Sequence, residues 1–125
     1  MRVLRGKVVS GIGNFSYWIE KLQDHYYRKT GMKFFPGTLN VELDQTYRVP
    51  QGAIRLEKEE YGGSVSVNIV PCRIFRREAY ILRTDKSEDE QGQGGRSIIE
   101  VASEVKLRAE YGLEDGDEVE VEVEE

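Results

Sequence analysis

The segment from Thr38 to Leu43 alternates strictly between polar and apolar residues, and it constrains the fold more than any other stretch of the chain. Side chains of a strand alternate between its two faces, so the apolar residues share one face and the polar residues share the other. The polar face carries Thr38, Asn40 and Glu42. We therefore predict a strand that packs on a core with one face and displays a hydroxyl, an amide and a carboxylate on the other.

Short alternating segments recur along the chain, separated by turn residues. Besides residues 38–43, the predicted strands cover residues 3–10, 53–57, 65–70, 72–75, 79–83, 97–102 and 119–123, with Pro71 ending or bending its strand. A helix is predicted over residues 16–30, capped by Ser16 and ended by Gly31, and a short helix over residues 104–111. The predicted fold is mainly β, within the α+β class: a small, mostly antiparallel β-barrel with one helix in its N-terminal half and a short C-terminal helix. An open α+β sheet is the alternative.

Composition limits the class of protein. A length of 125 residues fits one domain, residues 1–125, and 33% of the residues are charged. No apolar run approaches the roughly 20 residues of a membrane helix, and the start has no signal-peptide core, so we expect a cytoplasmic protein without a membrane partner. A net charge of −5 disfavours non-specific nucleic-acid binding. It leaves open a local basic site among the arginines at positions 73, 76, 77 and 83.

Two loops carry further hypotheses. Residues 10–14 form a tight loop with two glycines, which permit positive φ and let a ligand approach main-chain N–H groups. A plain strand-to-helix turn is the alternative for this loop. Residues 85–96 contain no apolar side chain, and this loop is either a lid over a substrate or a flexible insertion.

Three segments carry the motifs of a known family, in the order in which that family has them. They are residues 6–13, residues 35–43 with the sequence Phe-Pro-Gly-Thr-Leu-Asn-Val-Glu-Leu, and residues 106–108 followed by 111–117. With these motifs the chain resembles the archaeal-type, CTP-dependent riboflavin kinase family over nearly its whole length. The resemblance implies a six-stranded cradle-loop barrel. It also implies that riboflavin is phosphorylated to FMN, with CTP as the donor and a divalent metal.

The resemblance also implies roles for individual residues. Thr38 and Asn40 would bind the metal; because both ligands are neutral, the nucleotide phosphates must supply most of the charge that holds Mg²⁺. Glu100 would contact the flavin. It is also a candidate catalytic group, and Glu42 is the alternative for that catalytic role. Thr84 is the threonine nearest to a second flavin-contacting position of the family, so it is a further candidate flavin contact. The nucleotide would contact Gly11, Ile12, Gly13, Asn14, Phe15, Ser16, Val105, Lys106, Leu107 and Arg108.

Two positions depart from the family's glycine loop, where Phe15 replaces a third glycine and Ser16 replaces an arginine. They support a second hypothesis, a non-catalytic or differently specific barrel that binds a nucleotide or flavin. A third hypothesis is a small β-barrel interaction or nucleic-acid-binding module. The leading hypothesis remains a monomeric riboflavin kinase whose partners are riboflavin and a nucleoside triphosphate.

Overall fold

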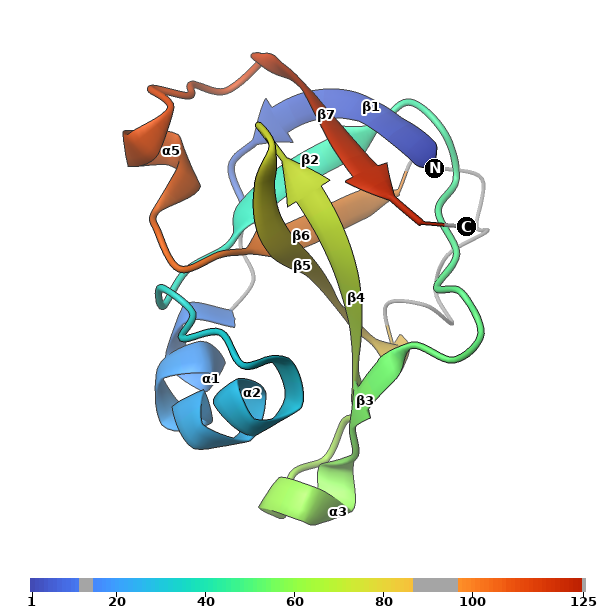
Figure 1. Cartoon of the computed structure of the whole chain (residues 1–125), viewed down its shortest axis with the longest axis vertical. Coiled ribbons are helices and arrows are strands. Elements are labelled where there is room, and N and C mark those ends of the chain that lie inside the picture. Colours follow the sequence, from blue (N-terminus) through green and yellow to red (C-terminus); the bar gives the residue numbers. More distant parts are fainter. Residues whose placement is uncertain (12–14, 87–96, 125) are drawn as a thin grey trace.

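Six antiparallel strands close into a barrel in the computed structural model, which describes residues 1–11, 15–86 and 97–124 (Figure 1). Neighbouring strands follow the order β4-β5-β6-β2-β1-β7, pairing of β7 with β4 closes the ring, and β3 extends the sheet beside β4. The strands are β1 (Arg2–Val9), β2 (Leu39–Leu43), β3 (Ile54–Leu56), β4 (Val67–Ile74), β5 (Arg77–Thr84), β6 (Ile98–Ala102) and β7 (Glu118–Val123). The predicted six-stranded barrel is confirmed, and the open sheet is excluded.

The alternation of β2 places its apolar residues in the barrel. Leu39, Val41 and Leu43 are buried in the main hydrophobic core, whereas Asn40 and Glu42 are only partly buried on the outer face. β2 pairs with β1 on one side and with β6 on the other. The polar face of this strand is therefore flanked by two strands that are far from it in sequence.

A second hydrophobic core lies outside the barrel, where two short helices cover the sheet (Figure 1). These are α1 (Phe15–Lys21) and α2 (Gln23–Thr30), where a single helix was predicted. Leu22 separates them because its φ of −108° and ψ of 25° are not helical, although Tyr26 N still donates to Leu22 O. The predicted end at Gly31 is confirmed, with φ of 75°, but the predicted cap is wrong because α1 already begins at Phe15, so Ser16 lies inside it.

Two further helices are a single turn long. α5 (Leu107–Glu110) is shorter than predicted, because residues 104 and 105 form a bend and Lys106 takes the position before the first helical residue. The Ser103 hydroxyl accepts a hydrogen bond from Val105 N at 3.1 Å within this bend. α3 (Lys58–Tyr61) was not predicted, and it is stabilised by a capping box between Glu57 and Glu60. Within the described residues, no helix has the length and apolar character that crossing a membrane requires.

Pro71 neither ends β4 nor interrupts its pairing with β5, where it lies opposite Tyr80. The other edge of β4 explains why proline is tolerated. That edge pairs with β3 at residues 67–69 and with β7 at residues 72–74, so Pro71 falls in the gap between the two partners. A missing N–H is harmless at such a position.

The β4–β5 hairpin turns at Phe75 and Arg76, so Arg77 is already part of β5 rather than of the turn. Both turn residues have positive φ, 52° and 63°, as a two-residue type I′ turn requires. Phe75 also stacks on Tyr111, with ring centroids 4.3 Å apart, so the turn lies against the segment that follows α5.

Replacing Arg76 by glycine is expected to stabilise the protein by about 0.5–1 kcal/mol, because glycine adopts positive φ without the strain of a side chain. The midpoint of thermal unfolding should rise by about 2–5 °C. Arg76→Ala is the matched control, since it removes the same charge but keeps the strain. An equal rise in both variants would contradict this explanation.

Candidate active site

Thr38, Asn40 and Glu100 converge on the outer face of the barrel, where β2 meets β6. Asn40 lies directly opposite Glu100 in the strand register, and Thr38 immediately precedes β2. The Thr38 hydroxyl donates a hydrogen bond to Glu100 Oε1 at 2.8 Å. The structure thus unites the two residues predicted to bind metal with the acid predicted to contact flavin, although 60 residues separate Asn40 from Glu100 in the sequence.

Glu100 lies beside the second hydrophobic core. Burial raises the pKa of its carboxyl above the ordinary value, and the hydrogen bond from Thr38 partly opposes that shift. Tyr26 of α2 is close enough for the Glu100 charge to add to the rise in its own pKa, which comes mainly from burial. The Tyr26 hydroxyl is buried, and it has no hydrogen-bond partner among the described residues. Glu100, the acid predicted to contact flavin, is therefore shielded from solvent.

The glycine loop begins beside Asn40. Val9 at the end of β1 pairs with Asn40, and a Cβ placed on Gly11 would lie 2.2 Å from Asn40 Nδ2. A side chain at position 11 would therefore displace the Asn40 amide. Residues 12–14 of the predicted nucleotide loop lie outside the described residues. At its far end, Phe15 is partly buried against the second core, and Ser16 is exposed on α1.

The second predicted nucleotide segment lies on the other side of Thr38. Together with Thr38, residues 105–108 line a small cavity of about 60 Å³. Leu107 is buried in the barrel core, so its side chain faces away from any nucleotide and only its main chain can contribute. Lys106 is exposed and Arg108 is partly buried, so these two cations remain available at the surface.

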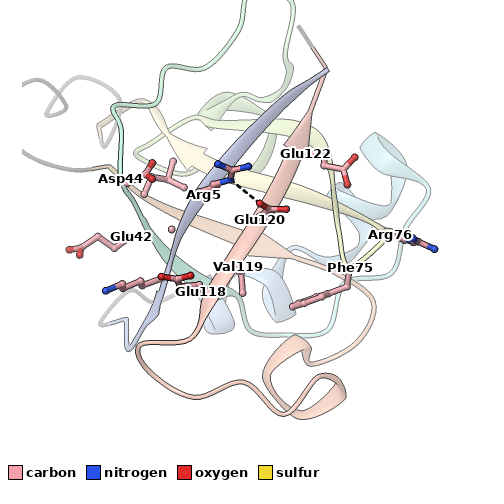
Figure 2. Close-up of a pocket in the computed structure, with 12 residues that line it drawn as sticks. Arg5, Glu42, Asp44, Phe75, Arg76, Glu118, Val119, Glu120 and Glu122 are labelled. Atoms are coloured by element: carbon pink, nitrogen blue, oxygen red, sulfur yellow. Dashed lines mark hydrogen bonds and ion pairs between the residues drawn. The ribbon is translucent and has the colours of Figure 1, made fainter.

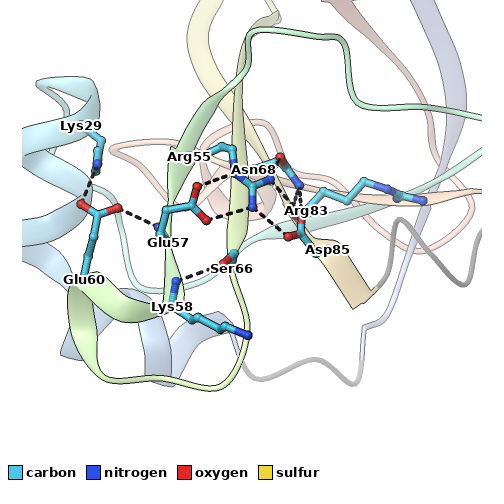
Figure 3. Close-up of polar contacts among 9 residues, drawn as sticks. All are labelled: Lys29, Arg55, Glu57, Lys58, Glu60, Ser66, Asn68, Arg83 and Asp85. Atoms are coloured by element: carbon cyan, nitrogen blue, oxygen red, sulfur yellow. Dashed lines mark hydrogen bonds and ion pairs between the residues drawn. The ribbon is translucent and has the colours of Figure 1, made fainter.

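Thr84 lies farther from the other candidate residues, at the end of β5. Leu82 is opposite Glu100, and Thr84 follows two residues later on the same face, about 6.6 Å along the strand. The next residue, Asp85, enters a polar network with Arg55 and Asn68 (Figure 3). Its carboxylate accepts hydrogen bonds from Arg55 Nη2 at 2.8 Å and from Asn68 Nδ2 at 2.9 Å. Thr84 thus shares a sheet face with Glu100 but lies two residues farther along β5, beside this polar network.

The donor atoms at Thr38 and Asn40 suit a hard cation. Because the Thr38 hydroxyl directs its proton to Glu100, its oxygen lone pairs remain available. The Asn40 amide has no hydrogen-bond partner among the described residues. No group of three His, Cys, Asp or Glu side chains that could hold a metal occurs in that part of the chain. Two neutral oxygens fit a cation that keeps waters and is bound mainly through substrate phosphates.

A larger cavity, of about 640 Å³, lies on the outer face of β1, β2 and β7 (Figure 2). Its charged lining consists of Glu42, Asp44, Glu118, Glu120, Glu122, Arg5, Lys7 and Arg76. Five carboxylates against three cations would repel a triphosphate. The larger cavity is therefore a poor candidate for the nucleotide site, despite its size. Glu42 lines this acidic cavity, whereas Glu100 lies at the site with Thr38.

The four arginines that suggested a basic site are not all exposed, and three of them are engaged in hydrogen bonds. Arg83 is buried, with its guanidinium bonded to Ile98 O at 3.2 Å. Arg77 donates to the Tyr111 hydroxyl at 3.0 Å, and Arg73 donates to the carbonyl oxygen of Arg76. These contacts leave little support for a nucleic-acid-binding face.

Ser10 and Asp115 also lie at the site, although no role was predicted for either residue. The Ser10 hydroxyl donates to Asp115 Oδ2 at 2.7 Å, and Arg108 pairs with the other oxygen of the same carboxylate. Asp115 belongs to the Asp-Gly-Asp turn near the C-terminus. That turn was part of the family resemblance, which was the only sequence signal that pointed to it.

Comparison with known proteins identifies the family of the chain. Residues 8–123 match the family model CTP-dep_RFKase, described as a domain of unknown function, DUF120. The chain is 35% identical over 130 residues to a riboflavin kinase of Methanocella arvoryzae, covering 98% of this chain and 57% of that protein.

Two further riboflavin kinases show how the match varies. One from Ignicoccus hospitalis is 35% identical over 131 residues, covering 94% of this chain and 69% of its own length. One from Staphylothermus marinus is 25% identical over 120 residues, covering 94% of this chain and 88% of its own length. The chain therefore spans little more than half of the Methanocella arvoryzae relative but most of the Staphylothermus marinus one. The chain belongs to the CTP-dependent riboflavin kinase family.

Proposed function

We propose that this protein transfers the γ-phosphoryl group of a nucleoside triphosphate to the 5′-hydroxyl of riboflavin, giving FMN. CTP is the proposed donor because the family is named for it, and CDP is then the second product. One observation carries the proposal: Thr38, Asn40 and Glu100 meet on one face, between the glycine loop and the Val105–Arg108 segment. This arrangement supports a phosphate site and an acceptor site that lie side by side.

In this proposal, each group has a distinct task. Glu100 accepts a hydrogen bond from the riboflavin hydroxyl and then its proton, for which its raised pKa makes the carboxylate a better acceptor. The hydroxyl oxygen bonds to the γ-phosphorus, and the bond from that phosphorus to the bridging oxygen breaks in line. Arg108 and main-chain N–H groups near Gly11 hold the phosphate oxygens, so positioning supplies much of the rate.

We propose Mg²⁺ as the metal, held by Thr38 Oγ1 and the Asn40 amide oxygen. Bound with the triphosphate, it would supply a Lewis acid that neutralises charge on the phosphate oxygens. Because both residues project from one strand face, the position of β2 sets their spacing.

The direct test is to incubate the purified protein with riboflavin, MgCl₂ and each of the four common nucleoside triphosphates, and to separate flavins by chromatography. FMN formation with CTP supports the proposal, and omission of the metal should abolish it. FMN formed equally well with ATP would contradict the choice of donor.

A second function is favoured by one observation: Ser16 and Phe15 leave the end of the glycine loop without a cation. A barrel that binds a nucleotide or flavin without turnover would fit this loss of a phosphate partner. Thermal stabilisation by CDP or FMN, without FMN synthesis, would identify this function.

A further inference from the structure

The turn formed by residues 114–117 is fixed to the end of β1 by its main chain. Gly116 N donates to Val8 O at 2.8 Å, and Val8 N donates to Asp117 O at 2.8 Å. Within the turn, Glu114 N donates to Asp117 Oδ2 at 2.8 Å. None of these hydrogen bonds involves the Asp115 side chain, so the turn does not depend on that carboxylate for its shape.

The Asp115 carboxylate instead joins two segments that come from opposite ends of the chain. Oδ2 accepts a hydrogen bond from the Ser10 hydroxyl at 2.7 Å, and Oδ1 pairs closely with Arg108 Nη2. The same Arg108 nitrogen donates to Val9 O at 3.4 Å. The Arg108 guanidinium, and then Ser10, hold the pKa of Asp115 below its ordinary value, so the carboxylate is ionised at neutral pH.

These contacts fix Arg108 by one end only. In the described part of the structure, all hydrogen bonds of the Arg108 side chain come from Nη2, and Nε and Nη1 make none. Arg108 also lines the 60 Å³ cavity beside Thr38. A guanidinium held in this way keeps donors for a phosphate oxygen and has already lost part of its rotational freedom.

The hydrogen bond from Ser10 to Asp115 also restrains the start of the glycine loop. It immediately precedes Gly11, whose backbone lies against the Asn40 amide. Asp115 therefore connects the start of the glycine loop, next to the proposed metal ligand, with the proposed phosphate-binding arginine.

We propose that Asp115 is a positioning residue for the nucleotide: it holds Ser10 and Arg108 together so that the two phosphate-binding segments form one site before the nucleotide arrives. This inference rests on the proposed function. Its physical basis is preorganisation, because a side chain ordered in advance does not lose that entropy on binding. A carboxylate is needed because it accepts from two donors at once, whereas an asparagine amide oxygen leaves its NH₂ facing one of them.

The test compares Asp115→Ala and Asp115→Asn with Glu114→Gln, which removes one exposed charge from the same turn. Affinity for CDP with MgCl₂ is measured by titration calorimetry, and kcat and KM are measured for both substrates. Both Asp115 variants should bind CDP about three- to tenfold more weakly, as expected when one or two side chains must be ordered on binding. KM for riboflavin and the melting temperature should stay near those of wild type, and Glu114→Gln should match wild type.

A double-mutant cycle with Arg108→Ala shows whether Asp115 acts through the arginine. Once Arg108 is absent, Asp115→Ala should weaken CDP binding by less than twofold. Equal effects in both backgrounds, or tighter CDP binding by Asp115→Ala, would overturn the inference. If the wild-type protein forms FMN and the Asp115 variants match Glu114→Gln, only the inference fails. If the wild-type protein neither binds CDP nor forms FMN, the proposed function fails and the inference fails with it.

Discussion

Replacing Asn40 by alanine is expected to lower kcat/KM for FMN formation by at least about 100-fold, because Asn40 is the proposed metal ligand and the loss of such a ligand removes several kcal/mol of charge stabilisation. The Asn40 side chain lies on the outer face of β2, while Leu39 and Val41 on the inner face build the core. Its truncation therefore opens no cavity in the barrel. The measurement is the initial rate of FMN formation over a range of MgCl₂ concentrations, with the melting temperature recorded for each variant.

Two further variants make this prediction specific. Asn40→Asp keeps an oxygen ligand and adds a charge, so it should retain activity and reach half-maximal rate at a lower metal concentration. Asp44→Asn changes an exposed side chain of the acidic cavity, just beyond the same strand, and should leave the rate unchanged. If Asn40→Ala keeps the metal dependence of wild type, Asn40 is not a metal ligand.

The fold could be predicted where a local pattern decides the structure. Alternation in residues 39–43 and 118–123 marks strands with one buried face, and both strands are found. Local patterns failed where distant contacts decide. Pro71 continues a strand because β3 and β7 approach it from different parts of the chain, and Leu22 interrupts a helix whose apolar spacing is regular.

In the candidate site, too, some features follow from local sequence pattern and others depend on contacts between distant segments. Thr38 and Asn40 share a face because of the strand period, so their proximity followed from spacing alone. Glu100 joined them through family resemblance, and the register of β2 with β6 now gives the physical reason. Asp115 and Ser10 are 105 residues apart, and no local pattern predicts that a turn near the C-terminus supports the first loop. The pairing of β1 with β7 brings these ends together.

Replacing Glu100 by glutamine is expected to lower kcat for FMN formation by about 100-fold, as for the loss of a general base, and to stabilise the protein at neutral pH. Glutamine can still accept the hydrogen bond from Thr38, so the strand contact is kept. The stability gain follows from the raised pKa of Glu100, which burial causes. The folded protein binds that proton more tightly than the unfolded chain does, so the stability that Glu100 contributes is full below its unfolded pKa and is lost as pH rises through the folded pKa.

The stability difference between Glu100→Gln and wild type should therefore be small at pH 4 and larger at pH 8. Thermal unfolding across this range measures it. Glu78→Gln is the matched control, because it removes the same charge from an exposed position on the neighbouring strand β5. Two outcomes would test the two roles of Glu100 separately. A kcat equal to that of wild type in Glu100→Gln would exclude Glu100 as the proton acceptor. A stability difference that does not change with pH would contradict the conclusion that burial raises the pKa of Glu100. If Glu100 is the proposed proton acceptor, Glu100→Gln should lose activity under the same conditions in which it gains stability.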